Sequence, residues 1–292
     1  MKTILVPTDF SPASVAAGKY AAELAKKFNS RIILLHVMES VDEGSFNIEG
    51  EAVADGSWED KLFNMKMIEK SRKDLAKATS EIAAEGINVK SVLRVGDAFH
   101  GIQSIITEQK TDVVVMGTEG TSDLQERIFV GSNTEKVVRR SGCPVISVNR
   151  KWSGSATPKS IVWATSLKDE DAFLPDVARE LMDAEGTTVH LLRVNTPGIF
   201  LSDSGAKEKL KAFAKTSELK NYTLNVYNDY EEEDGIIHFA SAIKADMIIL
   251  STHGRKGLSH LLNGSIAEDV LNNSRRPVMT YLLGSNGPAG RK

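Results

Sequence analysis

The fold is decided by a stretch that occurs twice in the chain, as TDVVVMGTEG at residues 111–120 and as ADMIILSTHG at residues 245–254. In each copy an aspartate precedes a short apolar run, and a Gly or Ser follows the run directly. A short apolar run that is bounded by turn residues is typical of a buried strand. The recurrence predicts that the chain is a tandem duplication of one unit.

Further matches extend the repeat on both sides of this stretch. KTILVPTD at 2–9 corresponds to KSIVWATS at 159–166, and EKVVRRSGCPV at 135–145 corresponds to EDVLNNSRRPV at 268–278. Each of the two later segments follows a Gly-Ser pair. The repeated units therefore keep the same order of motifs from beginning to end.

The boundary between the two units lies where the composition changes. Residues 151–158 are rich in Ser, Gly and Pro, which is typical of a linker. We predict one domain at 1–150, a linker at 151–158 and a second domain at 159–292. The length of 292 residues suits two domains, each of roughly 100–200 residues.

Composition and charge exclude several classes of protein. The chain has 36 basic and 39 acidic side chains and a net charge of -3, which argues against a general nucleic-acid binder. Its single cysteine, Cys143, cannot form an internal disulfide, which fits a reducing compartment. No apolar run approaches the ~18 residues of a membrane span, and the N-terminus lacks a signal-peptide pattern. We expect a cytoplasmic protein without a nucleic-acid or membrane partner.

Each half alternates apolar runs with helical patterns, which predicts an α/β fold with two tandem doubly wound sheets of five parallel strands. Ser11 before Pro12 predicts a helix start, with Ser11 as the cap. Residues 40–58 have no counterpart in the second half, and they are either an exposed loop or a lid over a ligand. The predicted strands are 3–6, 31–37, 89–95, 112–116, 144–148, 160–164, 188–194, 224–227, 246–250 and 277–282, and the predicted helices of the first half are 13–28, 61–84, 101–108 and 132–140.

Two glycine-bearing loops are candidates for binding an anion. The first half reads Gly117-x-x-Gly120, then ten residues, then Gly131-Ser132-Asn133, and the second reads Ser251-x-x-Gly254, then nine residues, then Gly264-Ser265-Ile266. Each Gly-Ser pair precedes a predicted helix, where unpaired N–H groups and the helix dipole attract a phosphate. The alternative is that each serine is a plain helix cap.

Asp9 follows the first predicted strand. In a doubly wound sheet, ligands bind beyond the carboxyl ends of the strands, at the point where the strand order reverses. A carboxylate at this point can accept hydrogen bonds from ribose hydroxyls. The alternative, which the sequence leaves equally open, is that Asp9 caps or braces the first helix.

Together these motifs resemble the universal stress protein family. The resemblance rests on ILVPTDFS at 4–11, LLHV at 34–37, the Gly-x-x-Gly…Gly-Ser loop and THGRKGL at 252–258 followed by GSIAE at 264–268. It implies a fold of the adenine nucleotide alpha hydrolase type with strand order 3-2-1-4-5 in each half. It also implies that the fifth strands form a dimerisation edge, so that the halves pair as an internal pseudo-dimer, with a homodimer as a further assembly.

The resemblance also implies a ligand, since many members of the family bind ATP and others do not. We therefore expect ATP or another adenine nucleotide, with Mg²⁺ as a candidate companion. Carried over position by position, the first-half site comprises Pro7, Thr8, Asp9, Val37, Met116, Gly117, Gly120, Gly131, Ser132 and Asn133. The second-half site comprises Ala164, Thr165, Val194, Ser251, His253, Gly254, Arg255, Gly264, Ser265 and Ile266.

The two copies depart from the family pattern in opposite ways. The first loop is one residue longer than usual and acidic, with Glu119, Asp123 and Glu126, whereas the second is basic, with His253, Arg255, Lys256 and His260. The second copy in turn has Ser166 in place of the aspartate. One half therefore keeps the carboxylate for a ribose, and the other keeps the better surroundings for phosphate.

These observations favour a stress-response protein that binds an adenine nucleotide and acts through partners without turnover. Two alternatives remain at this point. One is an enzyme, a slow ATPase or phosphotransferase that uses His253, Lys256 or a metal at the loop, and the other is an interaction scaffold that has lost its ligand. No general base is evident beside either loop.

Overall fold

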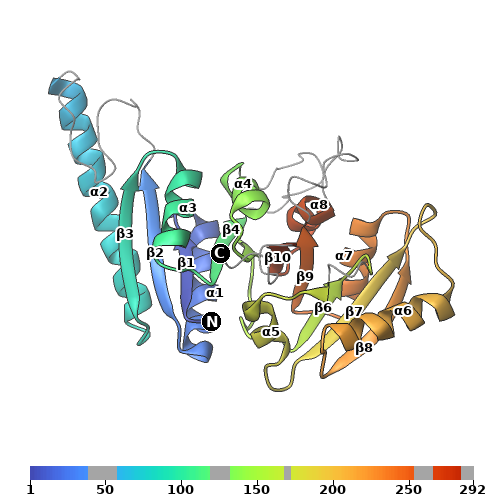
Figure 1. Ribbon diagram of the computed structural model, residues 1–292. Coiled ribbons are helices and arrows are strands. Elements are labelled where there is room, and N and C mark those ends of the chain that lie inside the picture. Colours follow the sequence, from blue (N-terminus) through green and yellow to red (C-terminus); the bar gives the residue numbers. More distant parts are fainter. Residues whose placement is uncertain (39–57, 119–131, 168–171, 253–265, 284–292) are drawn as a thin grey trace.

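The two halves form one continuous sheet (Figure 1). The structure is a computed structural model that describes residues 1–38, 58–118, 132–167, 172–252 and 266–283. Its 10-stranded sheet has the order β3-β2-β1-β4-β5-β10-β9-β6-β7-β8. Each half therefore has the predicted order 3-2-1-4-5, and all pairs within a half are parallel.

The strands of the first half are β1 (Thr3–Pro7), β2 (Arg31–Met38), β3 (Val89–Val95), β4 (Val113–Thr118) and β5 (Val145–Asn149). Those of the second half are β6 (Ser160–Ala164), β7 (Thr188–Asn195), β8 (Tyr222–Asn228), β9 (Met247–Thr252) and β10 (Val278–Leu282). The helices in the described part are α1 (Pro12–Phe28), α2 (Trp58–Ala83), α3 (Ala98–Glu108), α4 (Ser132–Arg140), α5 (Asp176–Met182), α6 (Asp203–Thr216), α7 (Glu232–Ala242) and α8 (Ile266–Asn273). The predicted segments match these elements to within three residues at each end.

The start of α1 follows the prediction from Ser11 and Pro12. The Ser11 side chain accepts a hydrogen bond from the backbone N–H of Ser14, and Pro12 is the first helical residue. The helix ends at Phe28, and its C-cap residue Asn29 adopts the left-handed conformation with φ 50°. Its last turn carries Lys26 and Lys27, which suit the negative end of the helix dipole.

The halves meet through their fifth strands, as predicted, and these two strands pair antiparallel. Val278, Met279 and Thr280 of β10 lie opposite Ser147, Ile146 and Val145 of β5, respectively. All six residues are at most 3% exposed, so the junction is as buried as the strands on either side of it. The pairing satisfies the backbone groups of two edges that would otherwise be open to another chain.

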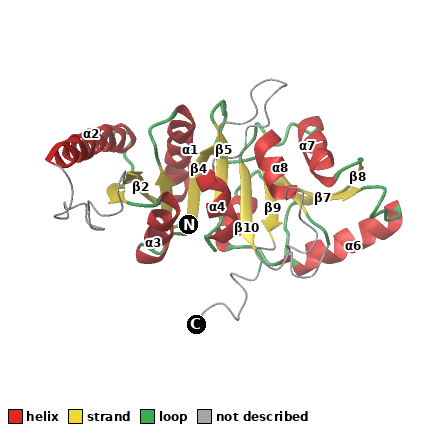
Figure 2. Ribbon diagram, turned by 90° about the horizontal axis from the view of Figure 1, so that it is seen from above, coloured by secondary structure: helices red, strands yellow, loops and turns green. Residues whose placement is uncertain are grey.

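The apolar core forms two layers, one on each face of the sheet, and each layer runs through both halves. One layer takes residues from α1, α2, α5 and α6 and includes Ile146 and Met279 at the junction. The other takes residues from α3, α4, α7 and α8 and includes Val145 and Val278. In the view from above, α1 and α2 lie on one side of the first half and α3 lies on the other (Figure 2). None of the described helices is long and apolar enough to cross a membrane.

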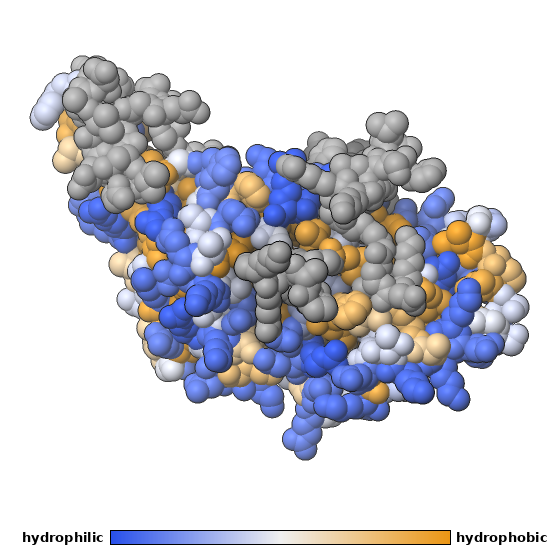
Figure 3. All heavy atoms as spheres, in the orientation of Figure 1, coloured by the Kyte–Doolittle hydropathy of each residue, from blue (hydrophilic) through white to orange (hydrophobic). Residues whose placement is uncertain are grey.

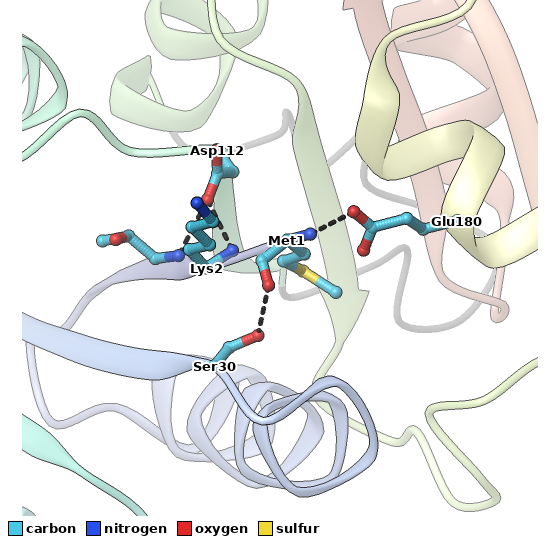
Figure 4. A network of polar contacts seen from close by, with 6 residues as sticks. Met1, Lys2, Ser30, Asp112 and Glu180 are labelled. Carbon is cyan, nitrogen blue, oxygen red and sulfur yellow. Dashed lines mark hydrogen bonds and ion pairs between the residues drawn. The ribbon is translucent and has the colours of Figure 1, made fainter.

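Contacts outside the sheet also join the halves. Trp152 in the connecting segment packs edge-on against Tyr20 of α1, with ring centroids 5.0 Å apart. The backbone N–H of Ala156 donates to Glu23 of α1 at 2.9 Å. The amino group of Met1 forms an ion pair with Glu180 of α5, beside a hydrogen bond from Ser30 to the Met1 carbonyl (Figure 4).

The helices that follow the first strand of each half differ in length. α1 has 17 residues, whereas α5 has 7. This difference in length was not predicted from the sequence. The predicted insertion at 40–58 lies outside the described residues except for Trp58, which begins α2 and is 78% exposed.

Gly117 explains how the long α1 fits against β4. A Cβ atom at Gly117 would lie 2.3 Å from the backbone carbon and oxygen of Ala13 and 2.7 Å from the nitrogen of Ser14. The first turn of α1 therefore rests directly on the backbone at the end of β4. The second half has Ser251 at the corresponding position, and its first helix, α5, is shorter and begins later after the first strand than α1 does.

We predict that Gly117→Ala lowers the free energy of unfolding by about 1–3 kcal/mol, because the added methyl group meets backbone atoms that cannot rotate away. Urea denaturation of the full chain measures this change. Gly198→Ala is the matched control, since a Cβ atom there meets nothing within 4 Å. Equal effects of the two substitutions would show that α1 does not rest on Gly117.

Candidate functional site

Six predicted residues of the first half come together at one edge of the sheet. β1 lies between β2 and β4 and is parallel to both, so the carboxyl ends of the three strands meet there. The backbone N–H of Thr8 continues the ladder by donating to the Leu35 carbonyl of β2 at 2.8 Å. The six residues are Pro7, Thr8 and Asp9 at the end of β1, Val37 in β2, and Met116 and Gly117 in β4.

Four predicted residues of the second half come together in the same way. β6 lies between β7 and β9, and the N–H of Thr165 donates to the Leu192 carbonyl at 3.0 Å. The four residues are Ala164 and Thr165 at the end of β6, Val194 in β7 and Ser251 in β9.

The remaining predicted residues belong to the two loops and the helices after them. Asn133 lies in the first turn of α4, and Ile266 begins α8. Ser132 begins α4, but its side chain lies outside the described residues. Gly120, Gly131, His253, Gly254, Arg255, Gly264 and Ser265 also lie outside the described residues.

The apolar members of both sets face the same layer of the core. Met116, Ala164 and Val194 are buried in the layer formed with α3, α4, α7 and α8, and Val37 packs against it. Leu250 occupies the position of Met116 in the second half, and it too is buried in this layer. Leu250 was not among the predicted site residues, although the repeat of residues 111–120 at 245–254 pairs it with Met116.

The chain makes the same turn after β1 and after β6. The Thr8 hydroxyl accepts a hydrogen bond from the N–H of Phe10 at 3.1 Å, and the Thr165 hydroxyl accepts one from Leu167 at 2.9 Å. Phe10 and Leu167 both adopt positive φ angles, 63° and 65°. A left-handed conformation at a bulky residue is uncommon and persists only where surrounding contacts enforce it. The turn is therefore kept in both halves although its middle residue changes from Asp9 to Ser166.

Asp9 braces this turn, and Ser11 caps the helix. Oδ1 of Asp9 accepts a hydrogen bond from the N–H of Ser11 at 3.0 Å. Partial desolvation would raise the pKa of Asp9, but hydrogen bonds from Ser11 and Ser14 outweigh it and hold the pKa below its ordinary value. Asp9 is thus ionised at neutral pH and exposed. A carboxylate has about four acceptor positions, so bracing the turn leaves it capacity for a ribose hydroxyl.

A glycine packs beneath the valine of each site, and neither glycine was among the predicted site residues. A Cβ atom at Gly101 of α3 would lie 2.8 Å from a methyl group of Val37, and one at Gly235 of α7 would lie 2.5 Å from Val194. Because glycine has no Cβ atom, each helix approaches the end of the second strand of its half more closely than it could with any other residue at this position. The sequence does contain one feature that marks these glycines, a Gly-Ile pair at 101–102 that recurs at 235–236.

The residue before each valine differs between the halves. Nδ1 of His36 donates to the Thr8 carbonyl at 2.7 Å, and the ring lies 4.5 Å from that of Phe10. The second half has Arg193 at this position, 6% exposed, with Nη1 3.5 Å from a Glu232 oxygen. Nε of Arg193 has no hydrogen-bond partner among the described residues.

An aspartate–histidine pair stands beside the third strand in each half. His100 lies 3.1 Å from Asp97 at the start of α3, and His238 lies 2.7 Å from Asp229 at the end of β8. The pKa of Asp97 is lowered mainly by the backbone N–H of His100, and that of Asp229 mainly by the side chain of His238. The two pairs therefore look alike but differ in what stabilises the charge.

The other reactive groups either lie away from the carboxyl edge of the sheet or are unreactive at neutral pH. Burial, with a smaller contribution from Asp112, raises the pKa of Cys143 to about 12, so this thiol is not a nucleophile at neutral pH. A surface hollow lined by Lys2, Arg31 and Lys110 lies at the amino ends of β1 and β2, opposite the candidate site. Within the described ranges, no group of three His, Cys, Asp or Glu residues could hold a metal ion.

Fold and geometry define the class as a duplicated, doubly wound α/β protein with a candidate ligand site at the carboxyl edge of each half. The profile of the universal stress protein family matches residues 1–149 and 158–281, and the chain belongs to that family.

Individual proteins agree with this assignment. Universal stress protein MJ0531 of Methanocaldococcus jannaschii is 32% identical over 149 residues, which are 51% of this chain and 82% of that protein. Universal stress protein Slr1230 of Synechocystis is 24% identical over 302 residues, which cover 96% of this chain and all of that protein. The crystal structure of a universal stress protein from Archaeoglobus fulgidus is 20% identical and has a TM-score of 0.76, covering 97% of this chain and 98% of that chain. The Slr1230 protein and the Archaeoglobus structure thus match this chain over both of its halves, whereas MJ0531 matches one half.

We predict that His238→Ala raises the pKa of Asp229 towards its ordinary value, because the substitution removes the side chain that chiefly stabilises the carboxylate. Carboxyl ¹³C NMR titration measures this shift. His100→Ala is the matched control, because it keeps the backbone N–H on which Asp97 mainly depends, and the pKa of Asp97 should move less.

The same shift has a consequence for stability. The pKa of Asp229 in the folded protein lies below its unfolded value of about 3.9, so its ionised form stabilises the fold at neutral pH. This contribution is lost as the pH falls through about 4 and below.

The pKa shifts in the two variants test the causes given above. If His100→Ala moved the pKa of Asp97 as far as His238→Ala moves the pKa of Asp229, the assigned causes would be wrong.

Proposed function

We propose that this protein binds an adenine nucleotide at the carboxyl edge of its half-sheets and acts through a protein partner. The observation that carries this proposal is the convergence of residues from three adjacent strands in each half, with a glycine packed beneath the valine of each site. A crevice beyond the carboxyl ends, where strand order reverses, is the usual nucleotide position in doubly wound sheets.

The described residues of the first half suit the parts of a nucleotide. Val37 and Met116 supply apolar side chains for a base. Asp9 supplies an ionised acceptor for ribose hydroxyls. The first turn of α4, with Asn133, supplies backbone N–H groups for a phosphate. Mg²⁺ would be held chiefly by the phosphates themselves, as this ion commonly is.

The second half offers the same apolar positions in Ala164, Val194 and Leu250 but carries Ser166 where Asp9 stands. A serine hydroxyl is a weaker acceptor than a carboxylate, because hydrogen bonds to charged groups are about twice as strong. The second half should therefore depend more on phosphate contacts from its basic loop than on ribose contacts.

Three measurements together separate the proposal from its alternatives. The purified protein is denatured, and any released nucleotide is identified and counted by mass spectrometry, followed by calorimetry of the full chain with ATP and adenosine. Bound adenine nucleotide supports the proposal. If no nucleotide is released and calorimetry detects no binding of ATP or adenosine, the interaction scaffold is the remaining alternative. Steady release of phosphate from ATP that is lost in His253→Ala would indicate a slow ATPase.

We predict that Asp9→Ala weakens adenosine binding in the full chain by about 1–3 kcal/mol, because it removes a charged acceptor. Asp9→Asn keeps an oxygen that can accept from Ser11, so it preserves the turn while removing the charge. Calorimetry measures affinity, and urea denaturation measures stability. If Asp9→Asn binds adenosine as tightly as the unchanged protein, the charge of Asp9 does not contact the ligand.

We also predict that the second half prefers the triphosphate. Arg255→Ser with Lys256→Ser should weaken ATP binding about tenfold, equivalent to about 1.4 kcal/mol, and should leave adenosine binding nearly unchanged. Glu119→Gln with Asp123→Asn and Glu126→Gln is the complementary variant, which should strengthen ATP binding in the first half. Loss of adenosine affinity in the first variant would show that the basic loop contacts more than the phosphates.

A further inference from the structure

Two neighbouring turns of the second half expose large apolar side chains. The turn between β7 and α6 exposes Ile199 and Phe200, which are 43% and 69% accessible. The turn between β8 and α7 exposes Tyr230, which is 82% accessible. Apolar surface is visible over the part of the second half in which the β7–α6 connection runs (Figure 3).

The first of these turns is held by a buried asparagine. Asn195, at the end of β7, is 3% exposed. Its side-chain amide donates to the Leu201 carbonyl at 3.0 Å and accepts from the Leu201 N–H at 3.3 Å. The N–H of Ile199 closes the turn by donating to the Thr196 carbonyl at 3.1 Å. Ile199 and Phe200 are thus presented outward by a fixed backbone.

The second turn is tied to the same asparagine. The side-chain amide of Asn195 also donates to the side chain of Asn228 at 3.2 Å. The backbone carbonyl of Asn195 accepts from the backbone N–H of Asp229 at 3.0 Å. Asp229 in turn accepts from the N–H of Tyr230 at 2.8 Å and from His238 at 2.7 Å. One polar network therefore fixes both turns, and Phe200 and Tyr230 each adjoin a residue bonded to Asn195.

Acidic side chains border these exposed rings. Glu231 and Asp234 are exposed at the start of α7, and Glu233 lies between them. Partial burial raises the pKa of Glu233, and the nearby carboxylates of Asp269, Glu231 and Asp234 raise it further. This mutual repulsion would be relieved by a cation brought to the surface.

We propose that the surface formed by Ile199, Phe200, Tyr230, Glu231 and Asp234 docks a basic amphipathic segment of a partner protein. Because hydrogen bonds fix the backbone that carries these side chains, the turns lose little freedom when a partner covers them, which favours affinity. Aromatic anchors with a charged rim are typical of protein interfaces. The acidic border selects a partner whose apolar side chains are flanked by Lys or Arg and disfavours a nucleotide at this surface.

The probe for this surface is a synthetic amphipathic peptide of about 18 residues with Leu on one helical face and Lys on the other. It is titrated into the full chain by fluorescence anisotropy at low and high salt. Phe200→Ser with Tyr230→Ser should weaken binding at least about tenfold. Glu231→Gln with Asp234→Asn should weaken it at low salt and much less at high salt, where charges are screened.

Matched controls separate this surface from other exposed apolar side chains. Phe173→Ser removes a ring that is 62% exposed elsewhere in the second half, and it should leave binding unchanged. On addition of the peptide, hydrogen exchange should slow at 196–202 and 229–234 and not at Trp58 and Phe63 of α2, which are 78% and 56% exposed.

Several results would overturn the proposal. They are equal loss of binding in Phe173→Ser, protection centred on α2, equal binding of a peptide with Glu in place of Lys, and dimerisation of the full chain that is abolished by Phe200→Ser with Tyr230→Ser. ATP affinity of the same variants is measured in parallel, so that failure here is distinguishable from failure of the nucleotide proposal.

Discussion

The antiparallel pairing of β5 with β10 is the interaction on which the rest of the structure depends. It turns two five-stranded sheets into one sheet of 10 strands and removes an open edge from each half. The side chains of the paired strands point alternately into the two core layers, with Ile146 and Met279 in one and Val145 and Val278 in the other. Breaking the pair would therefore expose backbone groups and open both layers at once.

This constraint also explains the contacts between the halves outside the sheet. Tyr20 and Trp152 pack together, and Glu23 accepts from Ala156, so α1 holds the connecting segment against the first half. The segment then enters β6 in a position that the β5–β10 pair has already fixed. A half expressed alone would lose these contacts together with its partner edge, and for this reason ligand binding is best measured in the full chain.

Much of the fold could be predicted because its signals are local and occur twice. Short apolar runs marked the strands, Ser11 and Pro12 marked the start of α1, and the repeat indicated that the fifth strands would meet. The length of α5 could not be predicted, because neither a strong cap nor a long apolar period marks its bounds. The recurring Gly-Ile pair marks Gly101 and Gly235 as equivalent positions, but the close contacts of these glycines and of Gly117 could not be predicted, since each depends on an element distant in sequence that comes within 3 Å of an added Cβ atom.

The candidate site shows how the two halves could diverge without losing their geometry. Thr8 and Thr165 hold the same left-handed turn through the backbone N–H of the residue two positions later. The middle residue contributes no backbone hydrogen bond to this interaction, so aspartate in one half and serine in the other are both compatible with it. The shared geometry of the turn thus rests on the threonine, and the brace that Asp9 adds through Ser11 belongs to the first half. A duplicated chain built in this way can change the side chain at one edge of the sheet while its strands, its core layers and its other edge stay as they are.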